Sequence, residues 1–532
     1  MKFIPFATRF SSPAADYFRT DDLHANLGRR TARGGLYTVA TMALNFFVVA
    51  TSTIWLTRAL SPADFGLYGM ILVIINFSTQ FVDLGLSRAV VQRAEITHEQ
   101  VSTLFWINLA IATIIAAIIA AATPLICDFY REPALAPVNL AMSSLFVISG
   151  LMLQHRALLQ RRMEFGRINS VAAISPVVGA VAGIVVATLG GGYWALVTVT
   201  LVTQLANCVG MWMACSWRPG PPRRGTGSRE MLAFGGHVTA FQFINYFTRN
   251  GDNILLGWRW GKEPLGLYSQ AFRLMLLPAS KIMTPLMQVM IPTLARLTDT
   301  PEKYRRFFHS ALSLLATACI LPSVLTMLLA PEVFPLVLGE QWNDSVPIFL
   351  VLGPAAIVTA TSSASWWLYL TFGHVERQTY AGIANMVFTV IAILCGLPYG
   401  PLGVAVAVTF ARVASNLPYF AYSCRDTPIS LKDYLGAVSW PTWISTLAAA
   451  GALVVSVLYL KFEILPGQIL PPLWQVLPIT ERQMFTILTI KLVAWTCFMV
   501  AMIALIPPVR EAIYAEPKNL LLKLLKKKEV AA

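Results

Sequence analysis

Long apolar runs recur along almost the whole chain, and they limit its fold more than any other feature. About fourteen segments between residues 36 and 506 are apolar enough to cross a membrane as helices, since a spanning helix needs about 20 mostly apolar residues. Only 12% of the 532 residues are charged, about half the share in a soluble domain. The runs are continuous rather than alternating, which excludes a membrane β-barrel. The sequence therefore predicts an all-α integral membrane protein with about fourteen transmembrane helices.

The order of the runs predicts two six-helix bundles followed by two extra helices. A basic segment rich in proline and glycine separates the sixth run from the seventh. The expected parts are a cytoplasmic tail at 1–35, an N-terminal bundle at 36–215, a basic cytoplasmic linker at 216–230, a C-terminal bundle at 231–423, two extra transmembrane helices within 437–506 and a basic cytoplasmic tail at 507–532.

The net charge of +14 follows from membrane orientation. With an even number of spans, most Lys and Arg residues fall in the tails and loops of one side. The positive-inside rule assigns that side to the cytoplasm, so we expect both termini there, in a bacterial inner membrane. The basic charge is thereby explained without nucleic-acid binding.

Motifs for catalysis and for metal or cofactor binding are absent from the sequence. The seven cysteines are odd in number and form no CxxC pair, which argues against a disulfide framework or a zinc site. There is no HExxH motif and no GxxxxGK[ST] loop. We therefore expect no metal, no cofactor and no enzyme activity. A membrane polysaccharide polymerase would need a sizeable loop with catalytic residues, and the longest outer segment, 461–483, holds few candidates.

Two segments about 200 residues apart are alike. Residues 58–68 and 259–268 each carry an arginine, then a Pro/Gly stretch, then a Gly-Leu-Tyr sequence. In each, the arginine is expected to end one span, the Pro/Gly stretch to turn the chain, and Tyr68 or Tyr268 to anchor the next span. This similarity predicts that spans 1–6 and 7–12 are parallel repeats, as in many transporters.

The seventh span carries a stripe of polar residues. At about 100° per residue, the members of this stripe occupy one arc about 100° wide. They are Gln242, Asn245, Arg249, Asp252 and Asn253. Lipid cannot satisfy such a stripe, so we expect it to line a wet interior. Alternatively, Arg249 and Asp252 pair with each other in a purely structural role.

Further ionisable residues lie in or beside other spans. Arg273 and Lys281 of the eighth span add positive charge, and arginine and lysine bind phosphate through charge-assisted hydrogen bonds. Asp252 is also a candidate for binding a coupling cation. Asp83 and Arg88 are expected to pair, either as a gate or as a structural lock.

Two later cations, Arg412 and Lys491, are expected to extend toward the membrane surface.

Several of these segments resemble the polysaccharide/O-antigen flippase family, in its colanic-acid-exporter-like branch. The resemblance runs over roughly residues 30–420. The motifs that carry it lie at 65–68, 83–92, 96–106, 157–165, 248–257 and 266–278.

This family belongs to the multidrug/oligosaccharidyl-lipid/polysaccharide exporter superfamily. The resemblance implies two six-helix bundles around a central cationic cavity. It implies transport of undecaprenyl-diphosphate-linked oligosaccharides across the membrane by alternating access. A polysaccharide polymerase and a chain-length regulator are then candidate partners beside the lipid bilayer. Export of another lipid-linked precursor, or of a small molecule, is the alternative within the same superfamily.

Overall fold

The structure of the chain is a computed structural model. It describes residues 27–83, 86–92, 96–223, 246, 250–462 and 479–505. Within these ranges the regular elements are all helices, which confirms the predicted all-α class.

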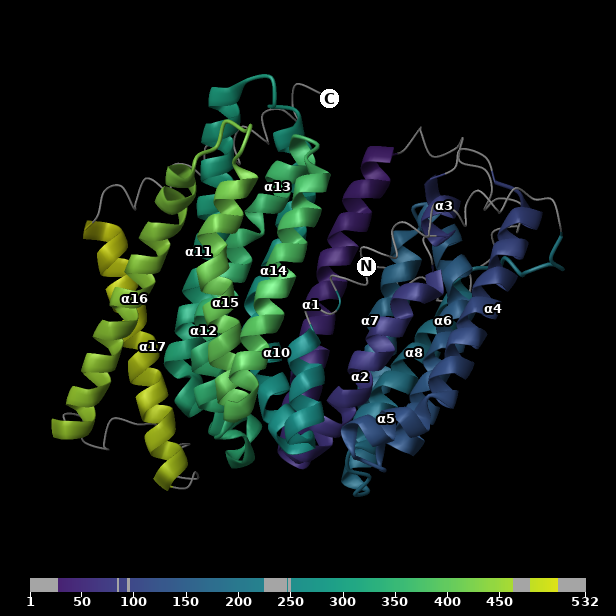
Figure 1. The fold of residues 1–532 in the computed structure, drawn as a ribbon, viewed down its shortest axis with the longest axis horizontal. Helices are drawn as coiled ribbons and strands as arrows, with labels where there is room; N and C mark the ends of the chain where they lie inside the picture. Colours follow the sequence, from purple (N-terminus) through teal and green to yellow (C-terminus); the bar gives the residue numbers. More distant parts are fainter. Residues whose placement is uncertain are drawn as a thin grey trace, which may run out of the picture. The chain divides into compact units, whose positions relative to one another are not determined.

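The chain forms two compact units, residues 1–266 and 267–532. The predicted bundle and linker boundaries remain predictions. The helices of the first unit (Figure 1) are α1 (Leu27–Ala59), α2 (Pro62–Asp83), α3 (Leu86–Gln92), α4 (His98–Ala121), α5 (Thr123–Tyr130), α6 (Leu135–Arg161), α7 (Phe165–Thr188) and α8 (Trp194–Ala214). Residues 250–260 are also helical.

The second unit holds most of α10 (Lys262–Ala295), which begins in the first. Its further α-helices are α11 (Pro301–Val333), α12 (Ser345–Ser362), α13 (Ala364–Thr371), α14 (Val375–Gly396), α15 (Gly400–Ser423), α16 (Leu431–Phe462) and α17 (Ile479–Leu505). Short turns of π and 3₁₀ helix lie at Phe334–Leu338, Glu340–Trp342 and Leu397–Tyr399. In Figure 1, α16 and α17 run side by side along one edge of this unit.

Nine helical stretches in the described part of the chain are long and apolar enough to cross a membrane. Two of these stretches, 345–371 and 376–423, each contain two successive helices. Many large apolar side chains on them are exposed, among them Val181 and Phe410, as expected where lipid replaces water as the solvent. The chain is therefore a multi-pass membrane protein, and the number of about fourteen spans remains a prediction.

Side-chain caps begin several of the helices. The Asp64 carboxylate accepts hydrogen bonds from the backbone N–H (3.0 Å) and hydroxyl (2.6 Å) of Ser61 at the start of α2. Asp433 makes the same two bonds with Ser430 at the start of α16. Such caps satisfy N–H groups that a helix terminus leaves without partners.

The same local geometry occurs in both units and supports the internal repeat. Met163 (φ 55°) and Gly373 (φ 75°) both adopt left-handed backbone conformations in the turns that precede α7 and α14. Four residues later, Arg167 and Arg377 each donate from Nη1 to a carbonyl at or just after the end of the following helix. The acceptors are the oxygens of Ala214 and Arg425, both at 3.2 Å.

The two glycines of the repeated Gly-Leu-Tyr sequence lie inside helices, and the chain turns just before each of these helices begins. Gly66 belongs to the first turns of α2, and Gly266 to those of α10. A Cβ atom on Gly66 would lie 1.6 Å from the carbonyl oxygen of Lys262, and one on Gly266 would lie 1.9 Å from that of Pro62. Glycine is thus required because two helix backbones touch.

Candidate functional site

The predicted polar stripe is described only in part. Gln242, Asn245 and Arg249 lie outside the described residues. Asp252 and Asn253 belong to the helix over 250–260, where Asp252 is only 3% exposed. Its Oδ1 accepts hydrogen bonds from the backbone N–H (2.8 Å) and the side-chain amide (3.3 Å) of Asn253. The carboxylate of Asp252 is thus buried and is hydrogen-bonded to the next stripe residue along the chain, Asn253.

The chain just before this helix is held against α2. The Tyr246 hydroxyl donates a hydrogen bond to the carbonyl of Val73, and its ring lies 5.3 Å from that of Phe77. Asn250 donates to the carbonyl of Tyr246 at 3.1 Å. These contacts fix Asp252 and Asn253 to the packed part of the first unit.

The two cations predicted on the eighth span lie on α10, in the second unit. Arg273 is an exposed position of this helix. Lys281 lies on the same helix, and its side chain is outside the described residues. The polar stripe and the α10 cations therefore belong to different units, and their proximity remains a prediction.

Asp83 is the last residue of α2 and acts locally on α3. Its Oδ1 accepts a hydrogen bond from the backbone N–H of Ser87 at 2.9 Å, in the first turn of that short helix. The side chain of Arg88 lies outside the described residues, so the predicted Asp83–Arg88 pair stays a prediction. Whether or not that pair forms, the hydrogen bond from Ser87 gives Asp83 a structural role at the start of α3.

Lys491 does not extend to the membrane surface, so that interpretation is wrong. Its Nζ is buried between α17 and α11, where it donates to Glu332 Oε1 (2.6 Å) and to the carbonyl of Leu328 (3.2 Å). Sequence reasoning did not identify Glu332 as its partner. The only signal was an acidic residue directly after Pro331 in an otherwise apolar run.

Arg412 also turns toward other helices. Its Nη1 donates to the hydroxyl of Thr359 on α12 at 2.8 Å, and its Cζ lies 5.9 Å from the centre of the Phe272 ring on α10. One turn further along α15, the Asn416 amide donates to the Tyr434 hydroxyl at 2.9 Å. Arg412 lies near the middle of α15. A guanidinium at the centre of a membrane-spanning helix costs about 2.5–3.5 kcal/mol on insertion scales and usually marks function.

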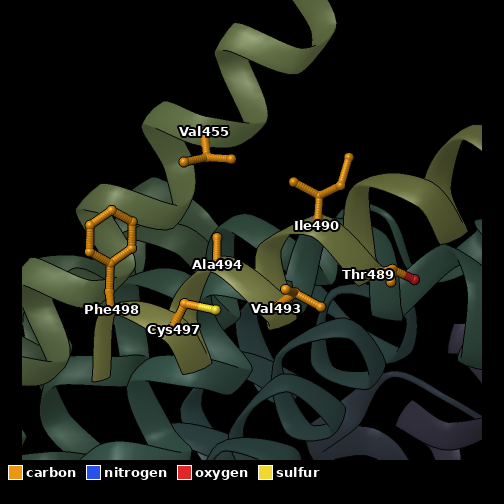
Figure 2. A pocket seen from close by; sticks show the side chains of 7 residues that line it. All are labelled: Val455, Thr489, Ile490, Val493, Ala494, Cys497 and Phe498. Atoms are coloured by element: carbon orange, nitrogen blue, oxygen red, sulfur yellow. The ribbon is translucent and has the colours of Figure 1, made fainter. Parts of the chain in front are cut away.

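An apolar groove runs between α16 and α17, with a volume of about 540 Å³. Figure 2 shows the side chains around it, which are Val455, Thr489, Ile490, Val493, Ala494, Cys497 and Phe498. Such a lining suits hydrocarbon and offers no charge to an anionic group. For metals, the described ranges contain no group of three or more His, Cys, Asp or Glu side chains that could hold an ion.

Comparison with known proteins agrees with this architecture. The model of the family described as "Polysaccharide biosynthesis protein" matches residues 55–347. The chain is 25% identical over 409 residues to the lipopolysaccharide biosynthesis protein WzxC of Escherichia coli (strain K12), covering 75% of this chain and 82% of that protein. It is 28% identical over 311 residues to the succinoglycan biosynthesis transport protein ExoT of Rhizobium meliloti (strain 1021), covering 56% and 60%.

Two solved structures share the fold. The lipid II flippase MurJ, in an inward closed conformation, matches with a TM-score of 0.67 at 14% identity, over 88% of this chain and 99% of that chain. An inward-facing multidrug resistance MATE family transporter of the MOP superfamily matches with a TM-score of 0.59 at 15% identity, over 73% and 97%. The family resemblance drawn from the sequence is thereby confirmed. Because the family model covers more than half of the chain, the protein belongs to the family described as "Polysaccharide biosynthesis protein".

Proposed function

We propose that the chain is a flippase for undecaprenyl-diphosphate-linked oligosaccharide repeat units in exopolysaccharide or lipopolysaccharide biosynthesis. It works in the bacterial inner membrane, with both termini in the cytoplasm. The observation that carries the proposal is the family match over residues 55–347 together with the MurJ-like fold. The named relatives act in polysaccharide biosynthesis and transport, and MurJ is a flippase of a lipid-linked precursor.

The chemistry of such a substrate requires positive groups inside the membrane. A glycan cannot cross hydrocarbon unaided, and a diphosphate needs cationic partners. In this proposal the substrate-binding residues are Gln242, Asn245, Arg249, Asn253, Arg273 and Lys281. They line a central cationic cavity that opens to each side in turn. A polysaccharide polymerase and a chain-length regulator receive the product.

Acidic residues have a separate part in this scheme. Asp252 is assigned to ion coupling or gating, together with Asp83 and Arg88. The support for Asp252 is its burial and the amide groups of Asn253 around its carboxylate. A buried ionisable residue within a membrane protein is a functional candidate by default.

Alanine substitution of the two arginines tests the proposal. We expect Arg249→Ala and Arg273→Ala each to abolish polymer export in a strain that depends on this chain, while the protein remains in the membrane at normal levels. Arg259→Ala is the matched control, because Arg259 is exposed near the end of its helix beside the Trp260 ring. Lysine substitutions of the first two should retain part of the export. Normal export by both alanine variants would refute the cationic mechanism.

A further inference from the structure

Helices α4 and α6 pack side by side in the first unit (Figure 1), and two contacts define their register. Toward the start of α6, the Asn139 amide donates a hydrogen bond to the carbonyl of Ile119 on α4 at 2.8 Å. Further along α6, a Cβ atom on Gly150 would lie 3.4 Å from the carbonyl oxygen of Asn108. The two helices are therefore antiparallel. The next turn of α6, which carries Gln154, lies beside the turn of α4 that ends at Asn108.

Asn108 and Gln154 are buried amides in this seam between the two helices. Both residues are 0% exposed, so neither lipid nor bulk water reaches them. The oxygen and the nitrogen of each side chain form no hydrogen bond with any described residue. Buried polar groups nearly always have a partner in a folded protein, because an unpaired one is costly. The seam therefore requires a partner group that the described residues do not supply.

The internal repeat shows which residues this kind of seam needs for packing. In the first unit α4 begins after the N-cap Thr97, and in the second unit α11 begins after the N-cap Thr300. Counted from these two threonines, Asn108 of α4 corresponds to Ala311 of α11.

The other helix of the seam, α6, corresponds to α12 and α13 of the second unit. Ser149 on α6 and Thr359 on α12 lie the same number of residues before the left-handed turns described above. Each of the two hydroxyls accepts a hydrogen bond at 2.8 Å, from Gln204 on α8 and from Arg412 on α15 respectively. This shared link supports the alignment of the two units along these helices.

Both amide positions are occupied by alanine in the second unit. In the alignment, Gln154 corresponds to Ala364, as Asn108 corresponds to Ala311. Ala311 and Ala364 are 0% exposed and belong to one apolar cluster. The second unit thus packs the same seam with apolar groups, so the packing of the helices does not explain the two amides of the first unit.

We propose that Asn108 and Gln154 bind ordered water between α4 and α6, inside the membrane-spanning part of the first unit. Each side-chain amide offers N–H donors and an oxygen acceptor. A water molecule can donate to the oxygens and accept from the N–H groups, and a buried water makes about three such bonds. A metal cation would bind only the two oxygens and leave both NH₂ groups without acceptors. The site therefore suits water rather than a cation, and it does not depend on the substrate of the protein.

X-ray hydroxyl-radical footprinting with mass spectrometry, on the full-length protein in lipid nanodiscs, tests this site. Radicals formed from a bound water modify the side chains beside it, even where bulk water does not reach. Phe105 and Phe308 are matched reporters, because they lie about one turn before Asn108 and Ala311 respectively and are at most 2% exposed. We expect Phe105 to be modified and Phe308 to remain unmodified.

The double variant Asn108→Ala/Gln154→Ala gives the first unit the residues of the second and should abolish the modification of Phe105. Gln204→Ala is the matched control, since it removes another side-chain amide of the same unit and should leave this modification unchanged. In the wild type, a Phe105 modified no more than Phe308 overturns the proposal without any variant.

Two further results would also overturn the water site. One is modification of Phe105 that persists in the double variant. The other is modification that appears only when sodium in the buffer is replaced by choline, which would show a cation in the place assigned to water.

Discussion

Removing the buried cation Lys491 should destabilise the protein more than removing both members of its ion pair. In Lys491→Met, Glu332 loses the 2.6 Å partner of its Oε1. Its Oε2 is already buried without a hydrogen bond among the described residues. Glu332 is only 8% exposed, so water cannot replace the lost ammonium. Breaking a buried pair in this way costs about 3–5 kcal/mol.

The double variant Lys491→Met/Glu332→Leu removes both charges and fills the space with apolar groups. Such replacements are often neutral or stabilising, because neither charge then has to be desolvated. Next to the pair, Leu328, Ile444 and Trp495 already form an apolar cluster into which methionine and leucine fit chemically. We therefore expect the free energy of unfolding of the double variant to lie within about 1 kcal/mol of the wild-type value. The second substitution would then restore most of the stability that Lys491→Met alone removes.

Unfolding in mixed micelles of dodecylmaltoside and increasing dodecyl sulfate, followed by tryptophan fluorescence, measures these free energies. Lys432→Met is the matched control. It makes the same substitution at an exposed position of α16, and such surface changes usually stay within about 0.5 kcal/mol. If Lys491→Met is as stable as wild type, or if the double variant is as unstable as the single one, the pair does not secure α17 to α11 and the reasoning fails.

Two further predictions concern the repeat and an exposed ion pair. Gly66→Ala should lower the yield of folded protein in fluorescence-detected size exclusion, because its Cβ would meet the Lys262 carbonyl at 1.6 Å, whereas Gly166→Ala, with open space around it, should not. The hydrogen bond from Arg377 (2.6 Å) lowers the pKa of Asp426 below its ordinary 3.8. This pair therefore stabilises the fold fully above about pH 4 and loses its effect as the pH falls through the lower folded pKa. Arg377→Gln should accordingly reduce the dependence of melting temperature on pH below 4, and an unchanged slope would contradict this assignment.

The helical class followed from the sequence because it depends on properties that each segment carries by itself. An apolar run of sufficient length must form its backbone hydrogen bonds internally once it is in lipid. The polar character of Asp252 and Asn253 was visible for the same reason, since their spacing on one helix requires no knowledge of other helices. The basic tails and loops likewise indicated orientation from local charge alone.

Contacts between distant segments could not be predicted in this way. The Pro/Gly stretches predict turns from local sequence alone, but nothing nearby in the sequence shows that Gly66 and Gly266 lie where the backbones of α2 and α10 touch. Lys491 was expected to extend toward the surface because nothing nearby in the sequence pairs with it, while Glu332 is 159 residues away. Periodicity identifies the face of a helix, but the partner on that face depends on tertiary packing.

Lys491 and Arg412 are both cations inside the membrane-spanning part of the chain, but they contact different kinds of group. Glu332 accounts for the charge of Lys491, since each of these two buried charges requires the other as its partner. The link from Arg412 to Thr359 needs only a donor, as the neutral Gln204 shows at the corresponding position of the first unit. The two halves of the repeat therefore keep the same hydrogen bond between helices with different donors, a neutral amide in the first unit and a guanidinium in the second.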